Sequence, residues 1–142
     1  MSTQVQETLV LVKPDGVARN LSGEILRRIE QKGYSLVDAK LVQAGRSLLA
    51  EHYAEHQGMP FFEPLVEFME SGPILVLRIA GERVIEGFRS LAGTTDPTTA
   101  APGTIRGDFG RDWGTKVQQN LVHGSDSPES AAREIALWFP NL

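Results

Sequence analysis

The sequence predicts a ferredoxin-like α/β sandwich, and two observations lead to this fold class. Four short apolar runs have the length and composition of strands, and segments with apolar residues at helical spacing separate them. The resulting order is strand, helix, strand, two helices, strand, helix, a long loop, strand and helix. Strands separated by helices in this way favour a split βαβ core.

The first three elements follow from local patterns. The apolar run 7–14 ends at a Lys-Pro pair and predicts a buried strand. Apolar residues at helical spacing predict a helix over residues 21–33, with Gly33 as its stop. Residues 34–42 alternate in polarity with an apolar majority, so they predict a second strand.

The middle of the chain continues the alternation. Residues 46–56 and 61–71 predict two short helices, and Pro64 is compatible only with the first turn of the second. The apolar run 73–80 predicts a central strand, and residues 81–93 predict the helix that follows it.

The amino-acid composition then changes. Residues 92–110 are rich in Gly, Pro and Thr and lack either periodicity, which predicts a long loop; such loops are often functional, and this one contains Arg106 between glycines. Residues 120–123 predict a last short strand. Ser127 and Pro128 stand at the preferred first positions of a final helix.

Length and composition indicate a single globular domain covering residues 1–142. The net charge of −4 gives no general attraction to nucleic acid or anionic membranes. The chain has no cysteine, which fits a reducing cytoplasm. We see no signal peptide and no apolar run of membrane-spanning length, so the expected location is cytoplasmic.

His123 is the first candidate for chemistry. A neutral imidazole suits a metal ligand, a base or a nucleophile, whereas a hydrogen-bonded core histidine is the more common case. Gly124 leaves room for a ligand, and the helix that begins near Ser127 directs N–H groups toward this corner. A neutral ring beside an anion site is what phosphoryl transfer through histidine requires.

Glu134 is the second candidate. It shares the face of the final helix that carries Ala131 and Trp138, and it lies two turns from the helix start, within reach of His123. A carboxylate on an apolar stripe needs a partner. A surface position or a pair with a nearby arginine is an equally good interpretation.

A metal site and a phosphate site are further possibilities. His52 and His56 are spaced as a ligand pair, but no third ligand is evident, and a solvated helix face is the preferred interpretation. Lys13 ends the first strand, where α/β folds place ligand groups. A credible set of phosphate donors is Lys13, Arg89, Thr95 and Arg106.

The segment NLVHGSDSPESAAREI resembles the active-site signature of nucleoside diphosphate kinases. The segments LVKPDGV, HYAEHQGMPFF, SGP and PGTIRGDF resemble further motifs of that family, in family order from about Glu7 to Phe139. The resemblance implies a ferredoxin-like βαββαβ core with a four-stranded antiparallel sheet and additional helices. It also implies a ping-pong reaction in which a phosphohistidine carries phosphate from a nucleoside triphosphate to a nucleoside diphosphate, with low base specificity.

By this resemblance, His123 is the expected nucleophile, acting through Nδ1, and Glu134 and Ser125 orient its ring. The groups expected to hold the phosphates and surround the histidine are Lys13, Tyr53, Arg89, Thr95 and Arg106.

The resemblance also assigns the nucleoside contacts. Asn120 is expected to hydrogen-bond the ribose together with Lys13. Phe61 is expected to stack on the base with Leu65 beside it. Stacking that does not read base edges explains low base specificity, because every base offers a π-face.

The implied cofactor is Mg²⁺, bridging substrate phosphates, with Asp126 as the nearest protein contact through water. The implied partners are nucleoside triphosphates and diphosphates, with neither nucleic acid nor membrane. The chain resembles the short bacterial form of the family. That form implies a homo-oligomer, a tetramer or hexamer built from dimers.

One segment departs from the family pattern. Between GTIRGDF and the Asn-x-Val-His motif, most members are a few residues shorter than the 110–119 segment here. We expect Val117 to flank the base opposite Phe61. Alternatively the extra length bulges outward, with Trp113 packed there or at a subunit contact.

Two other functions stay open. A histidine phosphocarrier acting on a protein partner needs His123 but neither Phe61 nor Asn120. A nucleotide-binding regulator or nucleic-acid-binding protein would show no turnover, and both the intact His-Gly-Ser-Asp motif and the acidic balance argue against it.

Overall fold

A computed structural model of the chain describes residues 5–115 and 117–140. The strands are β1 (Val5–Val12), β2 (Ser35–Val42), β3 (Ile74–Glu82) and β4 (Val122–Gly124). The helices are α1 (Pro14–Ala18), α2 (Ser22–Lys32), α3 (Arg46–His52), α4 (Phe62–Met69), α5 (Val84–Ala92), α6 (Ile105–Phe109) and α7 (Pro128–Trp138), with a short 3-10 helix at Ala54–His56. None of these helices is long and apolar enough to cross a membrane.

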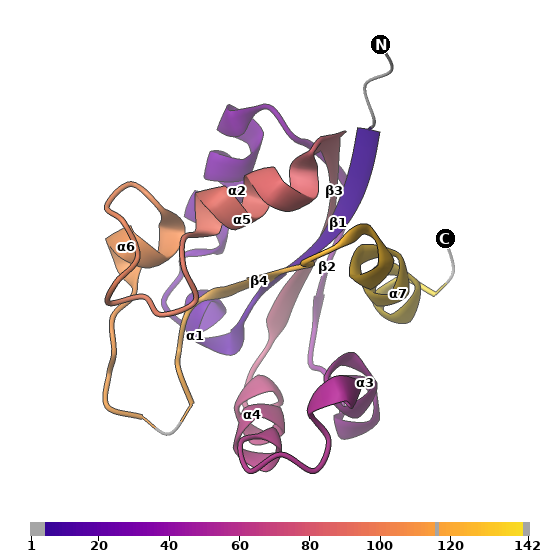
Figure 1. Cartoon of the computed structure of the whole chain (residues 1–142), viewed down its shortest axis with the longest axis vertical. Helices are drawn as coiled ribbons and strands as arrows, with labels where there is room; N and C mark the ends of the chain where they lie inside the picture. The colour runs from indigo at the N-terminus through magenta and orange to yellow at the C-terminus, as the bar shows by residue number, and fades with distance from the viewer. Residues whose placement is uncertain (1–4, 116, 141–142) are drawn as a thin grey trace.

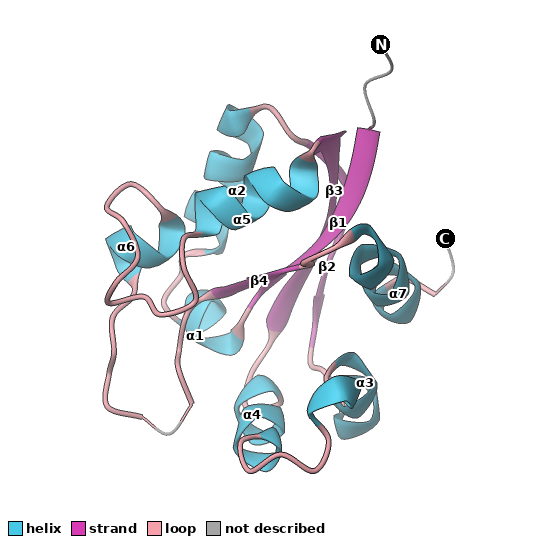
Figure 2. Ribbon diagram, viewed as in Figure 1, coloured by secondary structure: helices cyan, strands magenta, loops and turns pink. Residues whose placement is uncertain are grey.

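The four strands form one antiparallel sheet in the order β2-β3-β1-β4. The helices α2 and α5 lie together on one side of it, and α7 covers the other (Figures 1 and 2). This order confirms the ferredoxin-like prediction, including the central position of the 73–80 strand. The sheet brings β1 and β4 side by side, which places the end of β1, Val10–Val12, next to the histidine motif.

The core has two parts, one on each face of the sheet. Alternate residues of β1 divide between them: Val10 and Val12 pack with α2 and α5, whereas Leu9 and Leu11 pack with α3, α4 and α7. All four are fully buried. Burial of each such side chain contributes about 1.5–3 kcal/mol, so β1 anchors both layers.

The structure corrects several predicted boundaries. A single helix over 46–56 was wrong, because α3 ends at His52 and a 3-10 turn follows. The predicted 120–123 strand begins only at Val122. The segment 92–110 is not entirely loop, since it contains α6, whose N-cap Thr104 accepts the N–H of Gly107 at 3.0 Å. Five-residue helices such as α1 and α6 are too short to show a helical period.

Candidate active site

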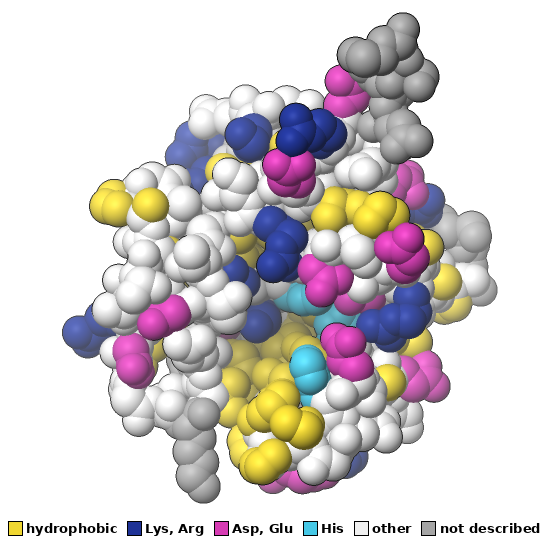
Figure 3. Space-filling model, in the orientation of Figure 1, with side chains coloured by type: hydrophobic (Ala, Val, Ile, Leu, Met, Phe, Trp, Pro, Cys, Tyr) yellow, Lys and Arg dark blue, Asp and Glu magenta, His cyan; other side chains and the backbone are white. Residues whose placement is uncertain are grey.

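His123 lies in β4 beside a cavity of about 180 Å³. The cavity walls include Tyr53 at the end of α3, Arg89 from α5 and Glu134 from α7. On this face of the molecule, histidine side chains gather in a hollow, with hydrophobic side chains below them and basic side chains beside them (Figure 3). The hollow therefore offers both charge and apolar surface to a ligand.

One carboxylate oxygen organises the histidine. Oε1 of Glu134 lies 2.7 Å from Nε2 of His123 and accepts a hydrogen bond from Oγ of Ser125 at 2.8 Å. The Ser125 hydroxyl in turn accepts the N–H of Leu9 at 3.2 Å, which ties the group to β1. The prediction that Glu134 and Ser125 orient the ring is consistent with this geometry, and Glu134 is buried rather than on the surface.

These contacts define the reactive atom of His123. A carboxylate only accepts, so Nε2 carries the proton and Nδ1 keeps its lone pair. Burial opposes ionisation of Glu134, but the hydrogen bond and charge of His123, together with Ser125, outweigh it and lower the pKa of Glu134. The carboxylate is therefore ionised at neutral pH and holds the tautomer in which Nδ1 is a nucleophile.

His52 is not on a solvated helix face, as the sequence had suggested, but is buried against His123. The ring centroids of the two histidines are 4.7 Å apart in an edge-on contact. Nε1 of Trp138 donates to Nδ1 of His52 at 3.0 Å. Burial and the charge of His123 lower the pKa of His52 to about 3, so this ring is neutral.

The same hydrogen bond decides against a metal at this place. His52, His123 and Glu134 bring three potential ligand atoms within 4.8 Å of one another. However, the Trp138 N–H occupies Nδ1 of His52, so Nε2 of that ring carries a proton and cannot ligate. His56 does not join the group, since its ring contacts Tyr53 and Phe61 instead.

Sequence reasoning missed His52 and Trp138 as site residues. Trp138 stands one turn after Glu134 on the same face of α7, and that spacing was the available signal. Tyr53 was included, and it lies edge-on to His52 at 4.6 Å. Burial and the nearby Glu134 raise the pKa of Tyr53, so its phenol stays protonated as a donor.

A second group of predicted residues meets next to the histidine. Nζ of Lys13 donates to Oδ1 of Asn120 at 2.8 Å, and Nδ2 of Asn120 donates to the carbonyl of Thr95 at 3.1 Å. Burial and the charge of Arg106 lower the pKa of Lys13 to about 8, while Asp15 opposes this. Lys13 is therefore still a cation at neutral pH, although burial and the charge of Arg106 destabilise its protonated form.

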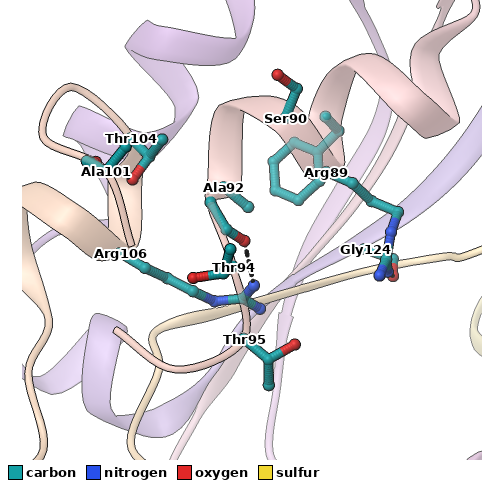
Figure 4. Close-up of a pocket in the computed structure, with 11 residues that line it drawn as sticks. Arg89, Ser90, Ala92, Thr94, Thr95, Ala101, Thr104, Arg106 and Gly124 are labelled. Carbon is teal, nitrogen blue, oxygen red and sulfur yellow. Dashed lines mark hydrogen bonds between the residues drawn. The ribbon is translucent and has the colours of Figure 1, made fainter. Parts of the chain in front are cut away.

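Two arginines border a larger pocket of about 590 Å³ next to the histidine cavity. In Figure 4, Arg106 reaches toward Thr94 and Thr95, and Arg89 lies across the pocket beside Gly124. Arg89 is exposed, with one long hydrogen bond of 3.4 Å to the carbonyl of Gly124. It is well placed to meet a charged ligand.

Arg106 is held much more firmly than Arg89. It donates to three backbone carbonyls, those of Gly93, Asn120 and Val122, at 2.7–3.0 Å. Of its five N–H groups, two remain for a ligand. Burial and Arg89 lower the pKa of Arg106 to about 10, so it stays charged at neutral pH.

The residues predicted to contact the base come from two segments far apart in the sequence, residues 61–65 and the segment before Asn120. Phe61 precedes α4, is 45% exposed and contacts His56 edge-on at 5.1 Å. Leu65 packs within α4 against the core. Val117 is half-buried. Trp113 is exposed, and the guanidinium groups of Arg19 and Arg111 lie 5.5 and 4.3 Å from the centroid of its ring.

Two exposed carboxylates line the cavity, Glu55 and Asp126, and Asp126 is the one that follows His123 closely in the sequence. A hydrogen bond involving Ser130 lowers its pKa, with Arg89 adding to the effect, so it is ionised at neutral pH. Glu134 is already committed to His123 and Ser125. An exposed carboxylate near Arg89, such as Asp126, fits a hard cation that is carried mainly by a ligand's own phosphates.

A family model for nucleoside diphosphate kinase matches residues 6–142. The nucleoside diphosphate kinase of Mycobacterium avium (strain 104) is 58% identical over 137 residues, covering 96% of this chain and 98% of the relative. That of Saccharopolyspora erythraea is 58% identical over 138 residues, with the same coverage.

Solved structures of nucleoside diphosphate kinases are also similar to this chain. A halophilic nucleoside diphosphate kinase from Halobacterium salinarum in complex with CDP superposes with a TM-score of 0.91 at 45% identity, over 97% of this chain and 90% of that one. A transition state mimic of the Borrelia burgdorferi enzyme with vanadate and ADP gives 0.89 at 35% identity, over 96% and 88%.

Proposed function

The chain belongs to the nucleoside diphosphate kinase family, and from that premise we propose how its own residues carry out the reaction. The protein transfers the terminal phosphate of a nucleoside triphosphate to a nucleoside diphosphate through a phosphohistidine. The observation that carries the assignment of the nucleophile is the hydrogen bond between Nε2 of His123 and Glu134, because it leaves Nδ1 free.

In the first half-reaction, the lone pair on Nδ1 of His123 attacks the γ-phosphorus of the triphosphate. The P–O bond to the β-phosphate breaks, and the departing diphosphate takes its electron pair. The proton on Nε2 stays toward Glu134, which stabilises the positive charge that develops on the ring. No proton needs to leave the histidine before attack.

The second half-reaction reverses these steps with a different nucleotide. A terminal oxygen of the bound diphosphate attacks the phosphorus, the P–N bond breaks and the electron pair returns to Nδ1 of His123. Because the imidazole returns to its starting tautomer, one site serves donor and acceptor in turn.

The basic side chains position and neutralise the phosphates. Arg89 is exposed at the cavity, and Arg106 keeps two N–H groups for a ligand. Tyr53 supplies a neutral hydroxyl, and Thr95 borders the larger pocket. Phosphoryl transfer needs such positioning and charge stabilisation more than covalent machinery.

The nucleoside lies over the apolar part of the hollow in this proposal. Lys13 and Asn120, already hydrogen-bonded to each other, turn toward the ribose. Phe61 presents an exposed ring to the base, and in this proposal Leu65 lies beside it and Val117 flanks the opposite side of the base. An aromatic face without base-edge contacts accepts every base.

A nucleotide-binding kinase generally works with a divalent cation, and we propose that the ion is Mg²⁺. Asp126 is the residue that would hold it, through water. When bound, the ion neutralises phosphate charge. An all-protein cage is not needed, because the substrate brings most of the oxygens.

We also propose that the enzyme is a homo-oligomer, a tetramer or hexamer built from dimers. β2 is an outer strand of the sheet, and it exposes Leu36, Val37 and Leu41. An uncovered edge with apolar side chains is a site for association. Leu41→Lys should lower the mass in sedimentation analysis, whereas an unchanged mass would exclude this edge.

We propose that the whole chain, residues 1–142, is one domain of this family and that it works in the cytoplasm, where its nucleotide substrates and a cysteine-free sequence fit together. The histidine phosphocarrier and the non-catalytic regulator have no separate support.

The test uses labelled ATP with unlabelled GDP. We expect the label to pass to an acid-labile phosphoenzyme and then to GTP, and we expect His123→Ala to lose both signals. Label that remains on the protein would favour a phosphocarrier, and no transfer would favour a binding protein. Activity in His123→Ala would end the assignment of the nucleophile.

A further inference from the structure

A strained turn stands immediately before the nucleophile. The N–H of Val122 donates to the carbonyl of Asn120 at 2.8 Å, and the residue between them, Leu121, has a φ of +74°. This is a γ-turn with a positive central φ, the rarer and more strained type. Leu121 is not a glycine, so the surrounding structure must hold it in the left-handed region.

The segment Lys13–Gly16 surrounds the strained residue. Oδ2 of Asp15 accepts the N–H of Leu121 at 3.1 Å, and the N–H of Lys13 donates to the Leu121 carbonyl at 2.8 Å. At Gly16, a Cβ atom would lie 3.1 Å from that carbonyl oxygen and 2.8 Å from a side-chain carbon of Val12. The absence of a side chain at Gly16 therefore lets the segment approach the turn.

The turn joins the two functional groups of the site. Asn120, at its start, bonds to Nζ of Lys13, and His123 follows directly after Val122. Arg106 donates to both carbonyls that flank Leu121, at 3.0 and 2.7 Å. A change of backbone at Leu121 would therefore move the nucleophile relative to the ligand groups.

Asp15 stands out among the contacts that hold this turn. It is buried, at 8% exposure, and its second oxygen, Oδ1, has no hydrogen-bond partner among the described residues. Burial of a carboxylate with an unsatisfied oxygen is costly, and a neutral core residue would avoid that cost. The hydrogen bond that the other oxygen of Asp15 accepts comes from the Leu121 N–H, and the charge of Asp15 also favours the cation of Lys13.

We propose that Asp15 is a positioning residue for phosphoryl transfer, whose carboxylate holds Leu121 in the strained γ-turn and thereby sets the place of Asn120 and His123. This inference rests on the proposed function, because its activity readout is the phosphorylation of His123. Asp15 acts through the backbone of Leu121.

The first test compares Asp15→Ala with Asp15→Asn. Asparagine keeps an acceptor oxygen for the Leu121 N–H, so it should phosphorylate His123 within about fivefold of the wild-type single-turnover rate. Alanine removes the acceptor and should slow this step by about 10–100-fold, even at saturating ATP and in protein shown to be folded by its thermal transition. A normal rate in folded Asp15→Ala would overturn the proposal.

The second test removes the strain itself. Glycine adopts positive φ without cost, whereas alanine does not. The two substitutions remove nearly the same part of the buried leucine side chain and differ by one methyl group. In the Asp15→Ala background, Leu121→Gly should therefore phosphorylate at least several-fold faster than Leu121→Ala. Equal rates for the two would show that Asp15 does not act through this turn.

A third measurement covers the case in which Asp15→Ala does not fold. In the wild-type background, Leu121→Gly should then melt at a higher temperature than Leu121→Ala, and Asp15→Asn should fold and phosphorylate normally. The opposite melting order, or a slow Asp15→Asn, would contradict the proposal. The transfer of label from ATP to GDP by the wild-type enzyme tests the proposed function separately. The melting comparisons do not require that function, so the two proposals can fail independently.

Discussion

Oε1 of Glu134 contacts both Nε2 of His123 and Oγ of Ser125, at 2.7 and 2.8 Å. One oxygen atom thus fixes the ring's rotation and its tautomer, and Ser125 ties that oxygen to β1 through the N–H of Leu9. The nucleophile is oriented before any nucleotide arrives. This is the pre-organisation on which phosphoryl transfer depends.

Replacement of Glu134 should therefore affect chemistry more than binding. We expect Glu134→Ala to lower the single-turnover rate of His123 phosphorylation by about 100-fold with little change in nucleotide affinity, because orientation and tautomer are lost. Glu134→Gln should retain more activity, since its oxygen can still accept from both partners. Glu129→Ala, an exposed glutamate of the same helix, is the control. A raised KM with unchanged kcat would count against the orienting role.

Local patterns predicted the fold order and suggested the candidate phosphate-binding side chains, but not the contacts that depend on distant partners. Glu134 stood out because a carboxylate on an apolar helix face needs a partner. His52 was assigned to a solvated face because its hydrogen-bond partner, Trp138, is 86 residues away. The positive φ of Leu121 has no signature in its own sequence, because Asp15, 106 residues earlier, accepts its N–H.

Loss of the proton from Lys13 should lower the activity of the enzyme at high pH. Its pKa of about 8 lies below its usual value of 10.5, so the charge is present below pH 8 and is lost above it. We expect kcat/KM to fall above about pH 8, because kcat/KM reports groups of the free enzyme. Lys13→Arg should be less active at pH 7 but should lack this fall. A wild-type profile that stays flat to pH 9.5 would contradict the assignment.

The same pKa shift has a consequence for stability. Between pH 8 and 10.5 the unfolded chain binds more protons at Lys13 than the folded chain does, so this group makes stability rise with pH over that window. Lys13→Met loses the hydrogen bond to Asn120 at every pH, but it removes this pH dependence. Its Tm relative to wild type should therefore fall between pH 8 and pH 10, and thermal unfolding of the two proteins at several pH values is the measurement. A Tm difference that stays constant over this window would contradict the lowered pKa of Lys13.

Replacement of Arg106 should lower the free energy of unfolding much more than replacement of Arg89. Arg106 donates to three backbone carbonyls, whereas Arg89 makes one hydrogen bond of 3.4 Å. Lysine cannot reproduce the three-way contact, so Arg106→Lys should cost about 2–4 kcal/mol in urea unfolding. Arg89→Lys should change stability by less than about 0.5 kcal/mol. Both should lower kcat/KM by about tenfold or more, since in the proposed mechanism both guanidinium groups bind the phosphates.

The hydrogen bond from Trp138 to His52 should matter for stability as well as for the tautomer. Trp138→Phe leaves Nδ1 of His52 buried without a donor, which should cost about 2–4 kcal/mol together with the lost volume. The penalty should be about 1–2 kcal/mol smaller in a His52→Leu background, because the unsatisfied nitrogen is then absent. Equal penalties in the two backgrounds would show that the hydrogen bond contributes nothing beyond packing.

The exposed ring of Phe61 should govern affinity for nucleotides without selecting among bases. We expect Phe61→Ala to raise KM by about 5–150-fold, because base stacking on an aromatic ring is worth about 1–3 kcal/mol. The increase should be similar for ADP, GDP, CDP and UDP, since each base presents a π-face and Phe61 offers no hydrogen-bonding group. Met59→Ala, which removes another exposed apolar side chain near by, is the matched control and should stay within about twofold of wild type. A new preference for one base in Phe61→Ala would show that this ring contributes to selection, and an unchanged KM would place the base elsewhere in the hollow.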